Sequence, residues 1–492
     1  MGNALAARNG GRLGLATLAA ILLLGLGLRV GEAWDGRAPV YDARAYAAIA
    51  ANLDAGRGFT VGGRATQPSS DYSPGLPLFV AGVYEATDGV HERLARLVLA
   101  VVGTLSVWFA YLLGRRLGWA LQRPKATGVA GVPTPGPRLL KSGRYSAQNP
   151  ATVWPALGGA LVVAIHPALL EYQGMLMGEP LAATLLSGGV LAALWTWDGG
   201  LARWLLPGAL FGALALVRPE YLAISVLLAL VVALRPCSLF ISISGANRPL
   251  TRDRWRRSVL AAAVLLAGVA VVVAPWTIRN AIALDRFAPI STGGGQVLFA
   301  GTYLPSDGDP ERVGAEVVAE NPQLFGPHAV EHLRLEQILA RLAHASHPDM
   351  ETDQALSKMG KEQLWEAISE EPAQYAGFVA TKVGRIWSHG PREVMREPGW
   401  ELMHWAIVAF GLLGLAVLAW QRRWEALLLG TIFLAITAIS ALLVASPRRV
   451  LVLVPLIAAL TAAVIQRVAS FGAYSAHKSP PAADRADSLS RP

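Results

Sequence analysis

Charged residues are scarce in this 492-residue sequence: Asp, Glu, Lys and Arg make up 16% of it, whereas hydrophobic residues make up 53%. Soluble globular domains carry about 25% charged residues, so this chain has too little polar surface for that class. Cys237 is the only cysteine, which excludes an internal disulfide and a cysteine-rich metal site. The sequence also lacks a Gly-x-x-x-x-Gly-Lys-Ser/Thr loop, which argues against an ATP-driven pump.

What the sequence does contain is a series of long apolar runs. A helix of about 20 residues crosses the roughly 30 Å of hydrocarbon in a bilayer, and it satisfies its own backbone hydrogen bonds there. We therefore predict an all-α polytopic membrane protein with about ten transmembrane helices. The expected spans are residues 13–30, 94–113, 153–165, 179–197, 201–217, 221–234, 259–275, 402–420, 426–444 and 450–465.

Basic loops set the expected orientation of these spans. Residues 114–150 carry seven Lys or Arg and no acid, and residues 235–257 are also strongly basic. Positive-inside sorting places both loops and both termini in the cytoplasm. The same sorting explains the net charge of +9 without a nucleic-acid partner. The first run follows two arginines and has no clear cleavage site after it, so we expect a retained signal anchor.

This orientation divides the chain into four parts. Residues 1–275 form an N-terminal transmembrane module with an outer loop at 32–93, and residues 276–399 form an outer domain. Residues 400–470 are C-terminal transmembrane helices, and 471–492 are expected to be a disordered cytoplasmic tail. The outer domain is expected to be helical because apolar residues recur at three- and four-residue spacing. Its expected helices are residues 310–320, 329–345, 353–369 and 373–387.

Asp42 stands at the start of a short helical pattern in the first outer loop. The pattern reads Asp42-Ala-Arg-Ala-Tyr46, continues with Ile49 and Leu53 on one face, and ends at Gly56. An acid in the first turn of a helix stabilises it by accepting from free backbone N–H groups and by opposing the helix dipole. That structural role is the ordinary interpretation of Asp42. The alternative is a catalytic base at the membrane surface.

Several arginines occur at the outer ends of spans, where positive-inside sorting disfavours them. One arginine alone could extend its side chain to lipid headgroups. Several together favour a shared anionic ligand, because the planar guanidinium matches phosphate oxygens. A lipid-linked phosphate is the obvious anion at that depth. The arginines are Arg29, Arg218, Arg279, Arg448 and Arg449, and Glu179 stands at the head of a span among them.

Five short motifs occur in a defined order along the chain. They are Asp42-Ala-Arg-Ala-Tyr46 with Gly56-Arg-Gly58-Phe59 behind it, Tyr72-Ser-Pro74-Gly-Leu-Pro77, Met177-Gly-Glu179-Pro180, Leu216-Val-Arg218-Pro219-Glu220 and Pro275-Trp276-Thr-Ile-Arg279-Asn280. In this order they resemble the polyprenyl-phosphate-dependent glycosyltransferases of the GT-C class. The nearest kin are lipid A aminoarabinose transferases and protein O-mannosyltransferases. The resemblance reaches about residue 301 and returns at 446–455.

The resemblance implies a GT-C-type helix bundle and a multi-pass enzyme of the cell membrane and cell envelope, with its active site on the outer face. Such an enzyme moves a hexose or pentose, such as mannose or arabinose, from a polyprenyl-phosphate carrier to a hydroxyl on a protein, lipid or polysaccharide. Asp42 would be the general base of an inverting transfer. The implied substrate-binding residues are Tyr46, Asp71, Glu179, Arg218, Glu220, Arg279, Asn280, Arg448 and Arg449.

The sequence departs from these relatives in some places. Asp71-Tyr72 lacks the basic partner found in aminoarabinose transferases, so an aminoarabinose donor is not supported. A divalent metal remains possible, but the histidines of the outer domain lack zinc-motif spacing and are expected at the surface; they are His328, His332, His344 and His347. The alternative function is a transporter or flippase of a lipid-linked anion, although no internal repeat is evident. A non-catalytic envelope scaffold is a third possibility.

Overall fold

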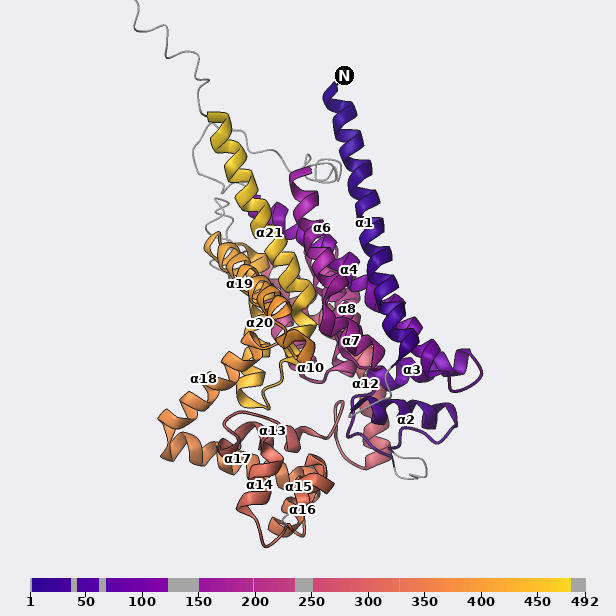
Figure 1. Ribbon diagram of the computed structural model, residues 1–492, viewed down its shortest axis with the longest axis vertical. Coiled ribbons are helices and arrows are strands. Elements are labelled where there is room, and N and C mark those ends of the chain that lie inside the picture. The colour runs from indigo at the N-terminus through magenta and orange to yellow at the C-terminus, as the bar shows by residue number, and fades with distance from the viewer. Residues whose placement is uncertain are drawn as a thin grey trace, which may run out of the picture.

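The computed structural model describes residues 2–36, 42–61, 68–122, 150–197, 199–234, 251–326 and 328–478. Throughout these ranges the chain is made of helices and connecting loops, without a strand. Long helices run side by side in a bundle, and a group of shorter helices, α13 to α18, lies at one end of it (Figure 1). The predicted all-α class is therefore confirmed.

Within the described part of the chain, six helices are long and apolar enough to cross a membrane, so this is a multi-pass membrane protein. A seventh span results if α6 (Pro150–Ile165) and α7 (Pro167–Gly174), which are bent by 40° at the break between them, count as one. The six are α1 (Gly2–Asp35), α4 (Glu92–Gln122), α12 (Arg252–Leu284), α19 (Pro398–Trp420), α20 (Trp424–Leu442) and α21 (Arg448–Lys478).

The expected count of ten spans is not confirmed. The other three predicted spans are helices at the predicted places, but α9 (Leu205–Val217) and α10 (Glu220–Ala233) are short. The third, α8 (Glu179–Thr196), is 18 residues long and almost wholly buried inside the bundle. A short 3-10 helix, η1 (Leu201–Trp204), precedes α9. Helix α21 continues to Lys478, past the expected start of the tail at residue 471.

Helix α21 occupies the centre of the bundle. In the apolar part of this helix 89% of residues are buried, and it packs against α4, α6, α8 and α19. Close helix approach elsewhere depends on small residues. Where α9 crosses α12, a Cβ at Gly208 would lie 2.1 Å from the Leu265 carbonyl oxygen, so only glycine fits there. Such small-residue contacts are how membrane helices gain packing without a hydrophobic driving force.

The shorter helices form two groups at one end of the bundle. Between α1 and α4 the chain forms α2 (Asp42–Asp54) and α3 (Gly75–Ala86). Between α12 and α19 it forms a helical segment with its own apolar core around Phe299, Val313 and Leu339. Its elements are α13 (Gly294–Thr302), η3 (Leu304–Ser306), α14 (Val313–Glu320), α15 (Ala329–His332), α16 (Leu335–Ser346), α17 (Thr352–Glu370), α18 (Pro372–Ser388) and η4 (Glu393–Arg396).

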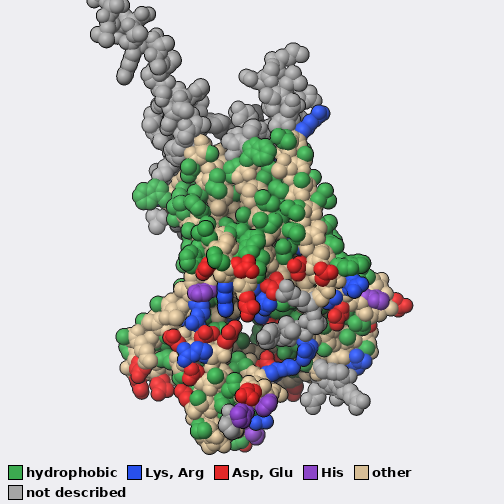
Figure 2. Space-filling view, viewed as in Figure 1, with side chains coloured by type: hydrophobic (Ala, Val, Ile, Leu, Met, Phe, Trp, Pro, Cys, Tyr) green, Lys and Arg blue, Asp and Glu red, His purple; other side chains and the backbone are tan. Residues whose placement is uncertain are grey.

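Polar and apolar side chains separate along the bundle. Hydrophobic side chains cover its middle, and charged side chains gather at the end that carries the shorter helices (Figure 2). This end is therefore suited to contact with water and lipid headgroups. Most of the basic loops on which the predicted orientation rests lie at 123–149 and 235–250, outside the described residues, as does the tail from 479 to 492.

Candidate functional site

A pocket of about 170 Å³ opens where the bundle meets the shorter helices. The ends of five helices meet around it: the starts of α2, α8, α10 and α21 and the end of α9. Glu179 begins α8, the Arg218-Pro219-Glu220 turn joins α9 to α10, and Arg448 begins α21, so these charges stand where apolar helices meet loops. Seven of the ten predicted site residues line the pocket: Asp42, Tyr46, Glu179, Arg218, Glu220, Arg448 and Arg449.

Glu179 is the buried centre of the pocket's charge network. It is the first residue of α8 and has no exposed surface. One of its oxygens, Oε1, accepts hydrogen bonds from Arg218 Nη2 at 2.7 Å and from Arg448 Nε. A buried carboxylate needs such partners, because an uncompensated buried charge is very costly. Its other oxygen, Oε2, is buried and accepts no hydrogen bond from the described part of the chain.

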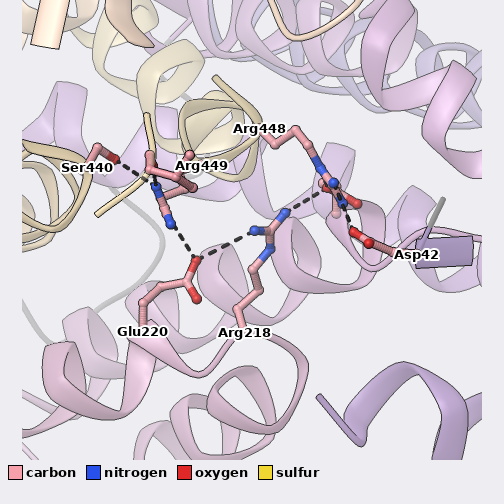
Figure 3. A network of polar contacts seen from close by, with 8 residues as sticks. Asp42, Arg218, Glu220, Ser440, Arg448 and Arg449 are labelled. Carbon is pink, nitrogen blue, oxygen red and sulfur yellow. Dashed lines mark hydrogen bonds and ion pairs between the residues drawn. The ribbon is translucent and has the colours of Figure 1, made fainter. Parts of the chain in front are cut away.

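Asp42 joins this network through Arg448. Its Oδ2 accepts from Arg448 Nη1 at 3.1 Å, and the Asp42 side chain is 37% exposed. Arg448 therefore bridges two carboxylates, the partly exposed Asp42 on α2 and the fully buried Glu179 on α8. Figure 3 shows the contact with Asp42. The carboxylate of Asp42 faces the pocket and is accessible, which is what a base acting on a bound hydroxyl needs.

The Arg-Pro-Glu turn between α9 and α10 supplies the other half of the network. Helix α9 ends at Val217, and Arg218 has an extended backbone conformation that directs its side chain across the pocket. Glu220 Oε1 lies 3.6 Å from Arg218 Nη1 and 3.6 Å from Arg449 Nε. Arg449 also donates to the backbone oxygen of Val444. The pocket thus holds three guanidinium groups and three carboxylates, which balance when all are ionised.

Two tyrosines border the acidic side of the pocket. The rings of Tyr46 and Tyr72 meet edge to face with centroids 5.8 Å apart. Burial, followed by the charge of Asp42, raises the pKa of Tyr46. Burial, followed by the charge of Glu336, raises the pKa of Tyr72 to about 12. Both phenols therefore stay protonated near neutral pH and can orient a carboxylate or a hydroxyl by hydrogen bonding.

The sequence did not point to Tyr172 on α7 or to the contacts of its ring with two arginines. The Arg448 guanidinium lies 5.6 Å from the centroid of the Tyr172 ring, and the Arg392 guanidinium lies 5.8 Å from the same centroid. Arg392 also donates to Glu171 Oε1 at 2.7 Å. Arg392 lies 220 residues further along the chain than Tyr172, so no local spacing connects them. The available signal was the His166-Pro167 pair, which marks a broken helix next to the site.

Arg29 lies apart from the pocket, inside the bundle, although it was grouped with the other arginines by sequence. Its side chain is 1% exposed and donates to the backbone oxygens of Gly25, Val163 and Ala164. In an unbroken helix the Val163 oxygen would accept from the N–H of residue 167, but Pro167 has none. Arg29 supplies a donor at this break, and it thereby braces the junction from which α7 departs.

Asp71, Arg279 and Asn280 are not among the residues that line the pocket. Arg279 donates to the backbone oxygens of Ser69 and Phe59 and stacks on the Trp276 ring at 4.9 Å. These contacts tie the segment between α2 and α3 to the end of α12. An arginine bound to carbonyl oxygens is indistinguishable by sequence from one that binds a phosphate.

Asn280 and Asp71 have similar connecting contacts. Asn280 Nδ2 donates to the backbone oxygens of Ala288 and Ile290. Asp71 accepts from the Thr292 hydroxyl at 3.0 Å, which joins the segment between α2 and α3 to the start of the helical segment. A role of these residues in substrate binding stays a prediction.

Across the described ranges, no group of three or more His, Cys, Asp or Glu is arranged to hold a metal ion. The predicted surface position holds for His328, His332 and His344, which are exposed, whereas His347 is half-buried. His328 pairs at 3.3 Å with Glu331, its neighbour on the same turn.

Comparison with solved structures identifies the fold. The oligosaccharyltransferase AglB from Archaeoglobus fulgidus, in complex with an inhibitory peptide and a dolichol-phosphate, matches with a TM-score of 0.52 at 15% identity. The match covers 95% of this chain and 52% of that chain. The apo form of the Archaeoglobus fulgidus oligosaccharyltransferase also gives 0.52, at 14% identity, over 94% of this chain and 52% of that chain. This chain thus spans about half the length of these proteins.

ArnT from Cupriavidus metallidurans bound to undecaprenyl phosphate matches with a TM-score of 0.39 at 15% identity, over 94% of this chain and 81% of that chain. No family model and no curated protein sequence matches the chain. The arrangement of helices, rather than sequence identity, therefore carries the comparison. Over nearly its whole length, the chain has the GT-C fold that its motifs predicted.

Proposed function

We propose that the protein is a membrane glycosyltransferase that moves a sugar from a polyprenyl-phosphate carrier to a hydroxyl acceptor on the outer face of the membrane, with both termini in the cytoplasm. The observation that carries this proposal is the pocket in which two arginines share the buried Glu179 beside the accessible Asp42. The GT-C fold supports it.

The arginines suit a phosphate at the membrane surface. Arg218 and Arg448 donate to the same carboxylate oxygen, so their guanidinium groups lie close enough together to hold a single anion. Guanidinium groups bind phosphate oxygens through paired N–H donors. The pocket is lined by charged residues at the ends of apolar helices. Charged side chains border the apolar part of the bundle at this end (Figure 2), where a lipid tail in the membrane would place its phosphate.

The chemistry proposed is a single displacement at the anomeric carbon. The acceptor oxygen forms the new bond to that carbon while the bond to the phosphate oxygen breaks, which inverts the anomeric centre. Asp42 takes the acceptor proton, a contribution worth roughly a hundred- to ten-thousand-fold in rate. The transition state has oxocarbenium character. Arg218 and Arg448 stabilise the negative charge that develops on the departing phosphate.

A transporter or flippase of a lipid-linked anion is the second candidate. One observation favours it: α6 and α7 form a helix pair bent by 40°, α7 carries Tyr172 to Arg448, and broken helices are common at transporter binding sites. The same pocket could hold the same phosphate without chemistry. The two functions differ in whether the sugar leaves its lipid.

The experiment is transfer in proteoliposomes. Radiolabelled polyprenyl-phosphate mannose, arabinose and glucose are offered with envelope extract as acceptor. The proteins are the wild type, Asp42→Asn, and the control Asp54→Asn, at the far end of the same helix and outside the pocket. Label that reaches the acceptor with the wild type and the control, but not with Asp42→Asn, supports the transferase. Label that crosses the bilayer still on its lipid, equally in all three, supports the flippase.

A further inference from the structure

Lys382 on α18 is a buried lysine with an unusual set of partners. Its side chain is 1% exposed, and its ammonium donates to the backbone oxygens of Gly301 at 2.6 Å and Ala441 at 2.7 Å. Within the described residues it forms no ion pair with a carboxylate. The surroundings are tight, since a Cβ at Gly308 would lie 2.6 Å from Lys382 Cγ. Burying an ammonium is costly, so a function that requires it there is expected.

The two acceptors are carbonyl groups at the ends of two different helices. Gly301 is in the last turn of α13, which ends at Thr302, and Ala441 is in the last turn of α20, which ends at Leu442. The last carbonyls of a helix have no partner within that helix, and they favour a positive charge. One ammonium therefore closes two helix ends at once and ties the shorter helices to the membrane bundle.

The end of α20 leads directly into the wall of the pocket. Val444 lines the pocket, its N–H donates to the Val297 oxygen at 3.3 Å, and its own oxygen accepts from Arg449. The backbone of α13 packs tightly against this wall, because a Cβ at Gly301 would lie 2.3 Å from the Leu443 carbonyl carbon. Arg449 in turn lies 3.6 Å from Glu220, the partner of Arg218.

We propose that Lys382 is a positioning residue for the pocket: it ties α13 to the end of α20, which fixes Val444 and so the place of the Arg449 guanidinium. Lys382 does not touch the pocket itself. It acts through the backbone of the segment from Ala441 to Val444. The catalytic meaning of this role rests on the proposed function, but the tie itself does not, and the test separates the two.

The test compares Lys382→Met, Lys382→Arg and a control in nanodiscs. Methionine keeps an unbranched apolar stem but donates nothing, whereas arginine keeps the charge and the donors. The control is Arg385→Met, on the same helix, because Arg385 pairs with Asp309 at 3.6 Å instead of bonding to α20. The measurements are amide hydrogen exchange of residues 441–447, binding of undecaprenyl phosphate, and transfer.

The expected result is that Lys382→Met raises the exchange rate of residues 441–447 at least about tenfold, because charged hydrogen bonds hold this segment. Binding of undecaprenyl phosphate should weaken, and kcat/KM should fall by roughly ten- to a hundredfold, as for other displaced site groups. Lys382→Arg should recover most of each loss. Arg385→Met should change none of the three.

Unchanged exchange in Lys382→Met would overturn the tie, whatever the activity. Faster exchange with unchanged undecaprenyl phosphate binding and transfer would leave Lys382 a structural residue only and would overturn the positioning role. If the wild type transfers no sugar, the proposed function fails, while exchange and undecaprenyl phosphate binding still decide the role of Lys382. If Lys382→Met does not fold, Lys382→Gln, which keeps an uncharged donor, is measured with the same three outcomes.

Discussion

Replacing Glu179 by glutamine is the sharpest perturbation of the pocket. The amide has nearly the same size as the carboxylate but no charge, so two guanidinium groups lose the anion they share. Because Glu179 is fully buried, water cannot replace it. Removing one partner of a buried ion pair costs about 3–5 kcal/mol. We expect the two guanidinium groups to move from the places in which they stabilise the departing phosphate, and a loss of that size in the transition state corresponds to a fall in kcat/KM of roughly a hundred- to a few thousandfold.

The same charge change should act in the opposite direction on ligand binding. With Glu179 neutral, the pocket has three guanidinium groups and two carboxylates, so it carries an excess positive charge. A phosphate would then offset a charge that the protein itself leaves unpaired. The thermal midpoint of empty Glu179→Gln should therefore be below that of the wild type, and undecaprenyl phosphate should raise it more than it raises the wild-type midpoint.

The control for this experiment is Glu220→Gln. Its carboxylate is 14% exposed and lies 3.6 Å from both of its arginines, so its loss should lower kcat/KM and the thermal midpoint by less than the loss of the fully buried Glu179. The assay is transfer kinetics together with thermal unfolding in nanodiscs. Equal effects of the two substitutions, or a Glu179→Gln enzyme with wild-type kinetics and thermal midpoint, would refute the electrostatic reasoning.

Three further predictions concern groups outside this network. Burial, followed by the charge of Arg449, lowers the pKa of Lys382 from 10.5 to about 8, so between these values only the unfolded chain holds the proton. The free energy of unfolding should therefore rise with pH between about 8 and 10.5, and this group should make no pH-dependent contribution to it below about pH 8. Lys382→Met should remove this pH dependence in thermal scans from pH 7 to 10. Arg29→Met should lower the thermal midpoint, since it leaves buried carbonyl oxygens without a donor at about 1–3 kcal/mol; an unchanged midpoint would contradict the bracing of α7. Tyr172→Leu should raise the KM for the lipid donor by about two- to tenfold by removing the aromatic face under Arg448, whereas Tyr172→Phe should keep the wild-type KM.

The helical class and most of the pocket could be predicted from the sequence because both depend on local patterns. Apolar runs specify helices, and charges at the ends of those runs must leave the hydrocarbon. Such charges are therefore expected at one level of the bundle, and those that meet there are Asp42, Glu179, Arg218 and Arg448. The number of spans could not be predicted in the same way. Helices as short as α9 and α10 are apolar enough for a membrane, but whether they cross it depends on tilt and packing.

What sequence could not provide is the identity of each polar side chain's partner. Arg279 and Arg218 occur in similar contexts at the ends of apolar helices, yet one binds backbone carbonyls and the other a carboxylate. Tyr172 and Lys382 reach the site or its wall through partners more than fifty residues away. Such contacts depend on how helix ends are juxtaposed in space, and no periodicity in the chain encodes that.

The two arginines that begin α21 have a consequence for how this protein can change. Positive charge at a helix N-terminus opposes the helix dipole, so Arg448 and Arg449 are an unfavourable start for α21, whose apolar part is 89% buried. The acids around them offset this, and those same acids surround the bound sugar phosphate in our proposal. Substitutions that reshape substrate preference here would therefore loosen the central helix. We expect variants with a new substrate specificity to require additional packing contacts along α21 that restore stability. Substrate specificity and folding stability would then evolve together.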